Sequence, residues 1–329
     1  MSAISEDQAA LRRTWEEHGC VVLEGTVPDD AIDRLLEDLA RAAAEGDDRL
    51  LARTPEDPDG YVPLRAGAAV EHVADPHAHL AAARDLLLSD ALVAWLRLVF
   101  DAEPLLFRAL AVERGEAQGP HQDSAYVAVS SPQALVSAYV ALEDAQEGSG
   151  ELVYWEGSHR VPEHLFSGRY KHWNPERDGD AEHEAWRREL EEHVAELPRR
   201  TFLPRKGDVL VWSADLVHAA APVTDEGRTR RSLVAHYCPV GVEPAYFGYR
   251  EDRRTTVAYN GGRYASEHHD LEPEPAPPEE EEETIPTAAE QQAVRAERRQ
   301  PSGAEPSGQP LRRRSGGLVG RVRGILGDR

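Results

Sequence analysis

The sequence predicts a mainly β fold, a sandwich or barrel with flanking helices, and three observations support this prediction. Helical periodicity of apolar residues is concentrated in the first 100 residues. Beyond them, short runs rich in Val, Tyr and Trp are separated by Gly, Pro and Asp, with no regular helices between them. A break in composition after residue 269 sets off the rest of the chain. We therefore expect one folded domain over residues 1–269, followed by a tail over 270–329.

The first 100 residues are predicted to form helices. Ser5 can cap a helix that runs to His18, and Gly19 follows as a stop signal. A short apolar run at 20–25 predicts a strand, and leucines at helical spacing predict a second helix over 29–44. A third helix is expected from about Pro76 to Phe100. Within 5–100 the sequence thus predicts a helical amino-terminal region.

Residues 101–250 carry the predicted barrel. A longer insertion over 162–197 interrupts the short runs, and its second half has a helical pattern. The predicted strands are 105–114, 124–129, 135–142, 151–155, 208–212 and 231–239.

The tail is predicted to be disordered, because residues 270–329 contain no Phe, Trp or Tyr and too little apolar surface to offset the entropy of ordering. Residues 270–290 are acidic and 291–329 are basic overall. The last twelve residues place apolar side chains at helical spacing between arginines, which leaves two interpretations open. They form either an unstructured end or a short helix that docks weakly on a partner or an anionic membrane.

Composition excludes several classes of protein. A formal charge of −23 argues against nucleic acid as the main partner. Cys20 and Cys238 are the only cysteines, which excludes a disulfide scaffold and fits a reducing compartment. No run of about 18 apolar residues occurs, so we expect neither a secretory signal nor a transmembrane segment. A cytoplasmic protein is the expectation.

Two histidines and an aspartate stand out as candidate metal ligands. On a strand, His121 and Asp123 would project to the same face and reach one point inside a barrel. By itself this pair is weak evidence for a metal site. His218, which follows a predicted strand, offers a third ligand.

An arginine near the end of the barrel region is a candidate anion receptor. Arg230 and Ser232 have strand spacing, in a run whose two faces both carry apolar residues. A buried arginine requires an anionic partner, and its planar fork suits a carboxylate. Arg228 and Arg231 lie close by and stay open as alternatives, although strand alternation turns Arg231 to the opposite face.

With these residues in place, the sequence resembles the phytanoyl-CoA dioxygenase family of Fe(II)/2-oxoglutarate oxygenases. The similarity extends over about residues 8–250. It rests on the order of several motifs, which is more specific than any one of them. These are LRRTWEEHGCVVLEG near the start, PHQDSAYVAV, ELVYWEGSHR, and KGDVLVWSADLVH followed by RTRRSLVAHY. The resemblance implies a double-stranded β-helix, the jelly-roll or cupin-like barrel.

The resemblance also implies roles for individual residues. His121, Asp123 and His218 would form the facial triad that binds Fe(II) and leaves open positions for 2-oxoglutarate and O2. Arg230 would pair with the distal carboxylate of 2-oxoglutarate, and Ser232 would assist it.

The implied activity is hydroxylation of a small-molecule metabolite, with release of succinate and CO2. Tyr139 falls where family members often place an aromatic residue beside the cosubstrate. Asp123 supports oxygen transfer, because related halogenases have a small residue at this position. Two other functions stay open. One is a non-catalytic metal-binding β-barrel module with a structural or 2-oxoglutarate-sensing role, and the other is a related barrel with a different metal and isomerase or lyase chemistry.

Other polar features are given structural roles. The Ser158–His159 pair is interpreted as a turn rather than a nucleophilic site, and His236 as a core histidine. His72, His77 and His79 are interpreted as solvated. We expect substrate selectivity to lie in residues 169–177 and around 61–65.

Overall fold

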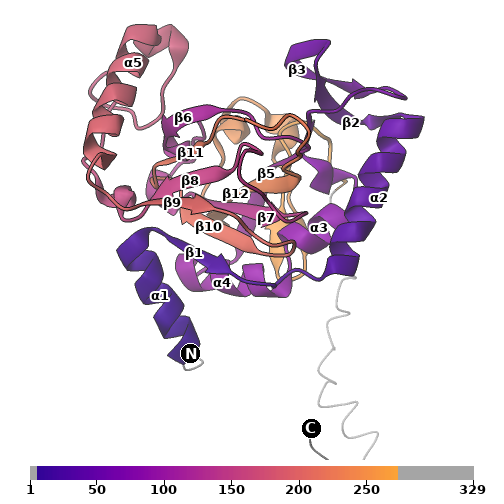
Figure 1. The fold of residues 1–329 in the computed structure, drawn as a ribbon, viewed down its shortest axis with the longest axis horizontal. Helices are drawn as coiled ribbons and strands as arrows, with labels where there is room; N and C mark the ends of the chain where they lie inside the picture. The colour runs from indigo at the N-terminus through magenta and orange to yellow at the C-terminus, as the bar shows by residue number, and fades with distance from the viewer. Residues whose placement is uncertain (1–5, 273–329) are drawn as a thin grey trace, which may run out of the picture. The chain divides into compact units, whose positions relative to one another are not determined.

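The computed structural model describes residues 6–272, which form two β-sheets with helices on the outside (Figure 1). Strand pairs within the sheets are antiparallel, apart from the parallel pairing of residues 263–264 with residues 105–106. The arrangement is the double-stranded β-helix, a jelly-roll barrel, so the predicted fold class is confirmed.

The large sheet has ten strands and the small sheet has four. In the large sheet the order is β1 (Cys20–Leu23), β10 (Val209–Ser213), β7 (Val136–Ala141), β12 (Ser232–Pro239), β5 (Pro104–Val112), β4 (His72–Ala74), β2 (Asp47–Thr54) and β3 (Asp57–Leu64). Two further strands, β13 (Val257–Tyr259) and β14 (Gly262–Tyr264), pair with each other, and β14 also joins β5. The small sheet runs β6 (Gln118–His121), β11 (His218–Ala220), β8 (Leu152–Trp155) and β9 (Arg199–Phe202).

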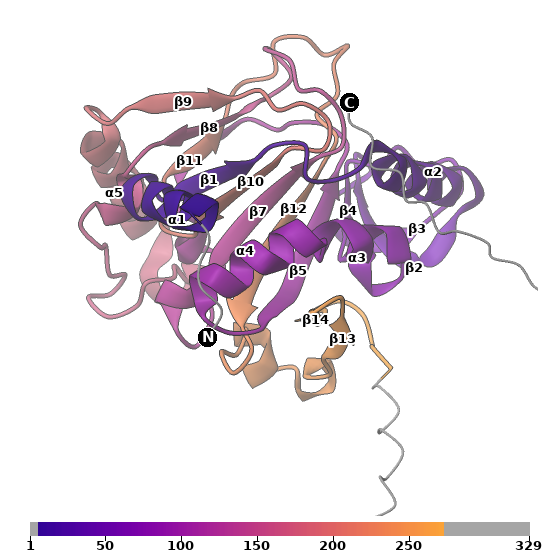
Figure 2. The same ribbon diagram turned by 90° about the horizontal axis from the view of Figure 1, so that it is seen from below.

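Four helices lie near the large sheet and one lies near the small sheet. Viewed from below, α3 and α4 run across the outer face of the large sheet, and α2 lies beside them (Figure 2). The fifth helix, α5, comes from the insertion and contacts β6. Their bounds are α1 (Glu6–His18), α2 (Asp29–Glu45), α3 (Ala81–Leu87), α4 (Asp90–Phe100) and α5 (Pro175–Val194).

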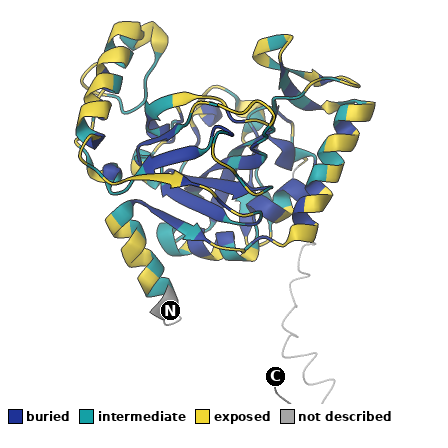
Figure 3. Cartoon of the chain, in the orientation of Figure 1, coloured by how far each residue is buried: buried dark blue, intermediate teal, exposed yellow. Residues whose placement is uncertain are grey.

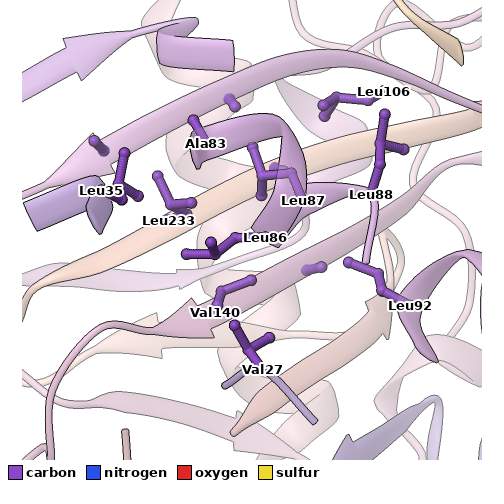
Figure 4. Close-up of a cluster of buried hydrophobic side chains, with 14 of the residues drawn as sticks. Val27, Leu35, Ala83, Leu86, Leu87, Leu88, Leu92, Leu106, Val140 and Leu233 are labelled. Atoms are coloured by element: carbon purple, nitrogen blue, oxygen red, sulfur yellow. The ribbon is translucent and has the colours of Figure 1, made fainter. Parts of the chain in front are cut away.

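Strand alternation decides which side chains enter the core and which face the interior of the barrel. On β7, Val136, Ala138 and Val140 pack in the main hydrophobic core, beneath the helices. Figure 4 shows Val140 and Leu233 of this core against the leucines of α3 and its flanking turn. The alternate residues of β7, among them Ser137 and Tyr139, face the other way, towards the small sheet. The large sheet therefore has one face for packing and one for a site.

Helix ends follow the sequence signals. Gly19 ends α1 with a φ of +78°, and its amide donates to the Trp15 carbonyl at 2.8 Å. The His159 ring occupies the space beside Gly19, and a Cβ there would lie 2.3 Å from its Nδ1. In Figure 3 the central strands of the large sheet are buried, whereas the outer faces of α2 and α5 are exposed.

Three predictions about elements are wrong. Residues 76–100 form a 3-10 turn and two helices, because the backbone at Leu88 leaves helical geometry and Ser89 starts a new helix. Residues 124–129, predicted as a strand, begin within a 3-10 turn over Asp123–Ala125. Besides the predicted strand at β1, the amino-terminal region contributes β2, β3 and β4, which the sequence did not predict.

No helix within the described residues is long and apolar enough to cross a membrane. The predicted disordered tail and its docking helix lie outside the described residues from 273 onward.

Candidate metal centre

Two strands of the small sheet and the turn after one of them bring three candidate ligands together. His121 ends β6 and His218 begins β11, and the two residues are direct cross-strand partners with ring centroids 4.2 Å apart. Asp123 lies in the 3-10 turn after β6, not on the strand that the sequence predicts. One ligand atom from each residue lies within 4.8 Å of the others, and all three residues are buried.

Both histidines are fixed by hydrogen bonds to the backbone. Nδ1 of His121 lies 3.0 Å from the Gly119 carbonyl oxygen, and Nδ1 of His218 lies 3.0 Å from the Leu216 carbonyl oxygen. A carbonyl can only accept, so each Nδ1 carries the proton and each Nε2 has a free lone pair. Those Nε2 atoms face Oδ1 of Asp123, at 3.9 Å from His121 and 3.5 Å from His218.

The carboxylate of Asp123 is held by its other oxygen. Ser137 Oγ donates to Oδ2 at 2.6 Å, and Trp212 Nε1 donates to the same atom at 3.0 Å. These donors come from β7 and β10 of the large sheet, whereas both histidines belong to the small sheet. The site therefore exists only where the two sheets face each other. Oδ1 is left directed at the histidines.

The charges of the cluster agree with a site for a cation. Burial by itself would raise the pKa of Asp123, but the neighbouring His218 and His236 hold it well below its ordinary value. Burial also disfavours the charged form of His218, yet the adjacent Asp123 outweighs burial and raises its pKa. Burial and the nearby His218 lower the pKa of His121 to about 3. Neutral imidazole and ionised carboxylate are the forms that bind metals, so His121 and Asp123 are in the binding form, whereas a metal would displace the proton that Asp123 stabilises on His218.

This donor set fits Fe(II). Two imidazole nitrogens and one carboxylate oxygen, all directed at one point, are the ligands of non-haem Fe(II) oxygenases, and they leave coordination positions open. The orienting bonds to both histidines and to Asp123 are the kind that tune metal sites.

The cluster opens into a cavity of about 280 Å³ between the two sheets. Arg230 lies in its wall, buried at 8% exposure, and its Nε has no hydrogen-bond partner within the described residues. The two competing arginines point elsewhere. Arg231 pairs with Glu113 at 2.8 Å, and Arg228 pairs with Asp225 at 2.8 Å.

Ser232 and Tyr139 are neighbours of Arg230, but they are not among the residues that line the cavity. The guanidinium carbon of Arg230 lies 5.7 Å from the centre of the Tyr139 ring. Ser232 Oγ donates to the Arg230 carbonyl oxygen at 3.4 Å. Arg230 itself precedes β12 and is not part of it. The three predicted residues are thus neighbours, but only Arg230 is positioned to meet a ligand directly.

Several cavity residues were missed or misjudged from the sequence. His236 lines the cavity, its Nε2 lies 3.9 Å from Asp123 Oδ2, and neither ring nitrogen has a hydrogen-bond partner in the described residues. The even spacing between Arg230 and His236 in the sequence places both on one face of the predicted strand. From the sequence, however, His236 was interpreted as a core residue. His72 and Arg108 also line the cavity. Ser137 and Trp212 gave no sequence signal, because their role depends on pairing between distant strands.

The histidines at 72–79 are not solvated as predicted. His77 is fully buried, with Nε2 2.8 Å from the Ala265 carbonyl oxygen. Burial lowers the pKa of His72 to about 4. The Ser158–His159 pair behaves as expected for a turn, since Ser158 Oγ donates to the Trp155 carbonyl oxygen at 2.6 Å.

Tyr126 lies at the rim of the cavity and contacts a residue of the insertion. The Tyr126 hydroxyl lies 2.8 Å from Nε2 of His183 on α5, and its ring centroid lies 5.8 Å from that of His121. Lys171, within the predicted selectivity segment, instead pairs with Asp215 at 2.7 Å.

Comparisons with known proteins agree with this geometry. Among solved structures, the epimerase SnoN in complex with Fe3+, alpha ketoglutarate and nogalamycin RO is 18% identical, with a TM-score of 0.55 over 79% of this chain and 98% of that chain. The carbocyclase SnoK from nogalamycin biosynthesis is 16% identical, with a TM-score of 0.52 over 73% and 86%. EctD from S. alaskensis in its apoform is 18% identical, with a TM-score of 0.51 over 72% and 78%. At these identities the likeness concerns the fold.

No curated protein matches the chain in sequence. A family model does match, over residues 15–232, which include all three ligands of the cluster and the cavity arginine. This match confirms the resemblance seen in the motifs, and the chain belongs to the phytanoyl-CoA dioxygenase (PhyH) family.

Proposed function

We propose that the protein is an Fe(II)- and 2-oxoglutarate-dependent dioxygenase that hydroxylates a small-molecule metabolite, with release of succinate and CO2. One observation carries the proposal. A buried cluster of two histidines and an aspartate shares its cavity with a buried arginine that has no acidic partner among the described residues. A structural metal would not require the arginine, whereas 2-oxoglutarate has a distal carboxylate that needs one. We place this activity in a domain over residues 1–269 and in the cytoplasm.

Each residue then has a defined task. His121, Asp123 and His218 would hold the iron, while Ser137 and Trp212 keep the aspartate oriented. Arg230 would bind the distal carboxylate of 2-oxoglutarate, supported by the Tyr139 ring beside it. Iron and 2-oxoglutarate, when bound, supply the oxidation of a substrate C–H bond by dioxygen. The apolar cavity walls, including Leu110 and Val234, exclude water from the reacting groups.

Hydroxylation is proposed over other outcomes because Asp123 occupies a ligand position and leaves no place there for a halide. Relatives by fold carry the names epimerase and carbocyclase, so the product needs its own test. Mass spectrometry of products formed under isotopically labelled dioxygen should show one labelled oxygen in the product. An unlabelled isomer or a cyclised product would contradict hydroxylation.

Binding of iron and cosubstrate can be tested without knowing the substrate. We expect the full chain, loaded with Fe(II) under argon, to develop a visible charge-transfer band when 2-oxoglutarate is added. Asp123→Ala should lose Fe(II) binding and succinate formation. An Asp123→Ala protein that binds iron fully and turns over would overturn the proposal.

The role of Arg230 has a matched control in Arg231, which carries the same charge but pairs with Glu113 on the outside. Arg230→Gln should raise the Kd for 2-oxoglutarate at least about 30-fold, because removing one partner of a buried charge pair costs about 2–5 kcal/mol. Arg231→Gln should bind 2-oxoglutarate as the native protein does. Equal effects of both substitutions would show that Arg230 has no specific role.

A non-catalytic sensing module stays the alternative. It would show the charge-transfer band but form no succinate, with or without candidate substrates.

A further inference from the structure

A bulge in β5 turns one arginine into the metal cavity. In the pairing of β5 with β12, Arg108 is opposite His236 and Leu106 is opposite Tyr237, so Phe107 is an extra residue. Leu106 packs in the main core, and strict alternation from it would direct Arg108 into the same apolar layer. The bulge reverses the phase, and Arg108, Leu110 and Val112 all line the cavity. Bulges of this kind re-aim side chains next to active sites.

Arg108 is partly buried and has no hydrogen bond or ion pair with any residue of the described range 6–272. The two acids of the cavity wall are engaged elsewhere. Asp123 belongs to the metal cluster, and Glu116 accepts a hydrogen bond from Arg53 at 2.5 Å. A cation in a partly buried, apolar-walled cavity is costly unless an anion meets it.

The position of Arg108 separates it from the predicted cosubstrate site. Along β12, Ser232 and His236 are four residues apart, about 13 Å, and Arg230 lies beyond Ser232. Arg108 pairs with His236 at the opposite end, where the Nε2 of His236 approaches Asp123. The backbone of Arg108 therefore lies at the end of the cavity away from Arg230, and its guanidinium acts electrostatically on Tyr61 and Tyr249.

Charge balance indicates what Arg108 binds. With His121 and His218 as metal ligands, which bind as neutral imidazoles, Fe(II) and Asp123 together leave one positive charge, and Arg230 adds a second. The two carboxylates of 2-oxoglutarate neutralise both. At the edge of the cavity, Glu116 and Glu71 both pair with Arg53 and are partly exposed to water. Arg108 is then a cation of the cavity wall that has no acid paired with it in the described residues, which matches one negative charge on the substrate.

We propose that the substrate is a small monocarboxylic acid and that Arg108 binds its carboxylate. The inference rests on the proposed function of the site. The cavity of about 280 Å³ lies just below the usual range of ligand pockets, so the compound is small. Apolar side chains in the wall indicate that the compound has a largely apolar body. They are Leu110, Val112, Val127, Leu152 and Val234.

The test compares acids with their neutral amides. The probes are hexanoate against hexanamide and benzoate against benzamide, added to the full chain loaded with Fe(II) and 2-oxoglutarate under argon. Calorimetry measures their binding, and after oxygen is admitted, succinate release measures their effect on turnover. We expect each acid to bind the native protein about 10- to 100-fold more tightly than its amide, as hydrogen bonds to a charged group predict.

Three variants assign this preference to Arg108. Arg108→Gln should erase the difference between acid and amide, and Arg108→Lys should keep part of it because the charge remains. Arg13→Gln, which removes a charge from an exposed position on α1, should behave as the native protein does.

Each outcome decides the proposal. It is overturned if the amides bind as well as the acids, if neither acid binds, or if Arg108→Gln keeps the preference. It is also overturned if Arg108→Gln mainly abolishes the 2-oxoglutarate band, because Arg108 would then bind the cosubstrate. Absence of that band in the native protein would instead contradict the proposed function itself, so the two failures are distinguishable.

Discussion

At the scale of single residues, the two oxygens of Asp123 have different roles in the metal centre. Oδ2 accepts hydrogen bonds from Ser137 and Trp212, whereas Oδ1 faces the histidines. A carboxylate held in this way does not rotate when the metal leaves, so little orientation is lost on binding.

The hydrogen bond from Trp212 gives a prediction about metal affinity. Trp212→Phe removes the donor while keeping most of the buried ring, and we expect Fe(II) affinity to fall about 10- to 100-fold, as for other residues that orient metal ligands. Anaerobic competition with a chromophoric chelator measures the affinity. Phe202, equally aromatic and in the same apolar cluster but without a bond to Asp123, offers the control Phe202→Leu. A Trp212→Phe protein with native affinity would mean that the bond to Asp123 has no effect on the metal.

The role of a residue can be predicted from the sequence where its chemistry allows few alternatives. A buried arginine demands an anion, and strand phase turned Arg231 away from Arg230, while Arg228 stayed open as an alternative. It failed for His236 and Arg108, because a polar residue in a β run is compatible with either face until the register and the bulges are known.

At the scale of elements, α5 is attached to the barrel through a small apolar cluster of its own. Trp186, Leu190 and Val194 pack there against Phe166 and Val217, apart from the main core under α2, α3 and α4. The ring of Trp186 lies 5.9 Å from that of Tyr126 at the cavity rim. Packing of α5 is thus linked to the cavity but only weakly to the rest of the fold.

This separation predicts local unfolding. Trp186→Ala should weaken the attachment of α5 by about 3–5 kcal/mol, the usual cost of truncating a buried tryptophan. Because the main core is untouched, we expect proteolysis within residues 162–197 to accelerate at least about 100-fold, with a smaller change in the global unfolding midpoint. Limited proteolysis and urea titration measure the two quantities. Arg188→Ala, at an exposed position of the same helix, should change neither. Parallel loss of protease resistance and global stability would show that α5 unfolds with the whole domain.

Elements whose apolar residues recur with a clear helical or strand period were predicted well, and elements without such a period were not. The helix α2 has Ile32 and Leu35 buried on one face, and its predicted and observed bounds agree closely. The strands β2 and β3 were missed because their sequences show no clear alternation and contain only Thr54 and Val62 as β-branched residues. They form because β4, which is itself paired with β5, offers β2 an edge to pair with.

At the scale of the whole molecule, buried histidines couple folding to pH. Burial lowers the pKa of His72 and of His269 to about 4, and it also lowers the pKa of the fully buried His77. In the unfolded chain a histidine titrates near pH 6.5. Between these values the unfolded chain binds protons that the folded protein excludes.

Stability should therefore fall as the pH falls from about 6.5 to 4. Each histidine that is protonated only in the unfolded state contributes a slope of up to about 1.4 kcal/mol per pH unit. Urea unfolding of the metal-free protein at a series of pH values measures the slope. His269→Asn should make it shallower, because one group that excludes a proton is removed. A slope that is flat across this window, or unchanged in the variant, would contradict the prediction.

The sequence by itself determined the fold class and the family, and it predicted the candidate ligands and Arg230, since these depend on residue type and on spacing along the chain. The tertiary structure alone decided that Ser137 and Trp212 hold Asp123, that the histidine pair is a cross-strand pair, and that a bulge directs Arg108 into the cavity. The physical reason is the same in each case. Side-chain direction in a β fold depends on register between strands far apart in the chain, and packing of the two sheets sets that register.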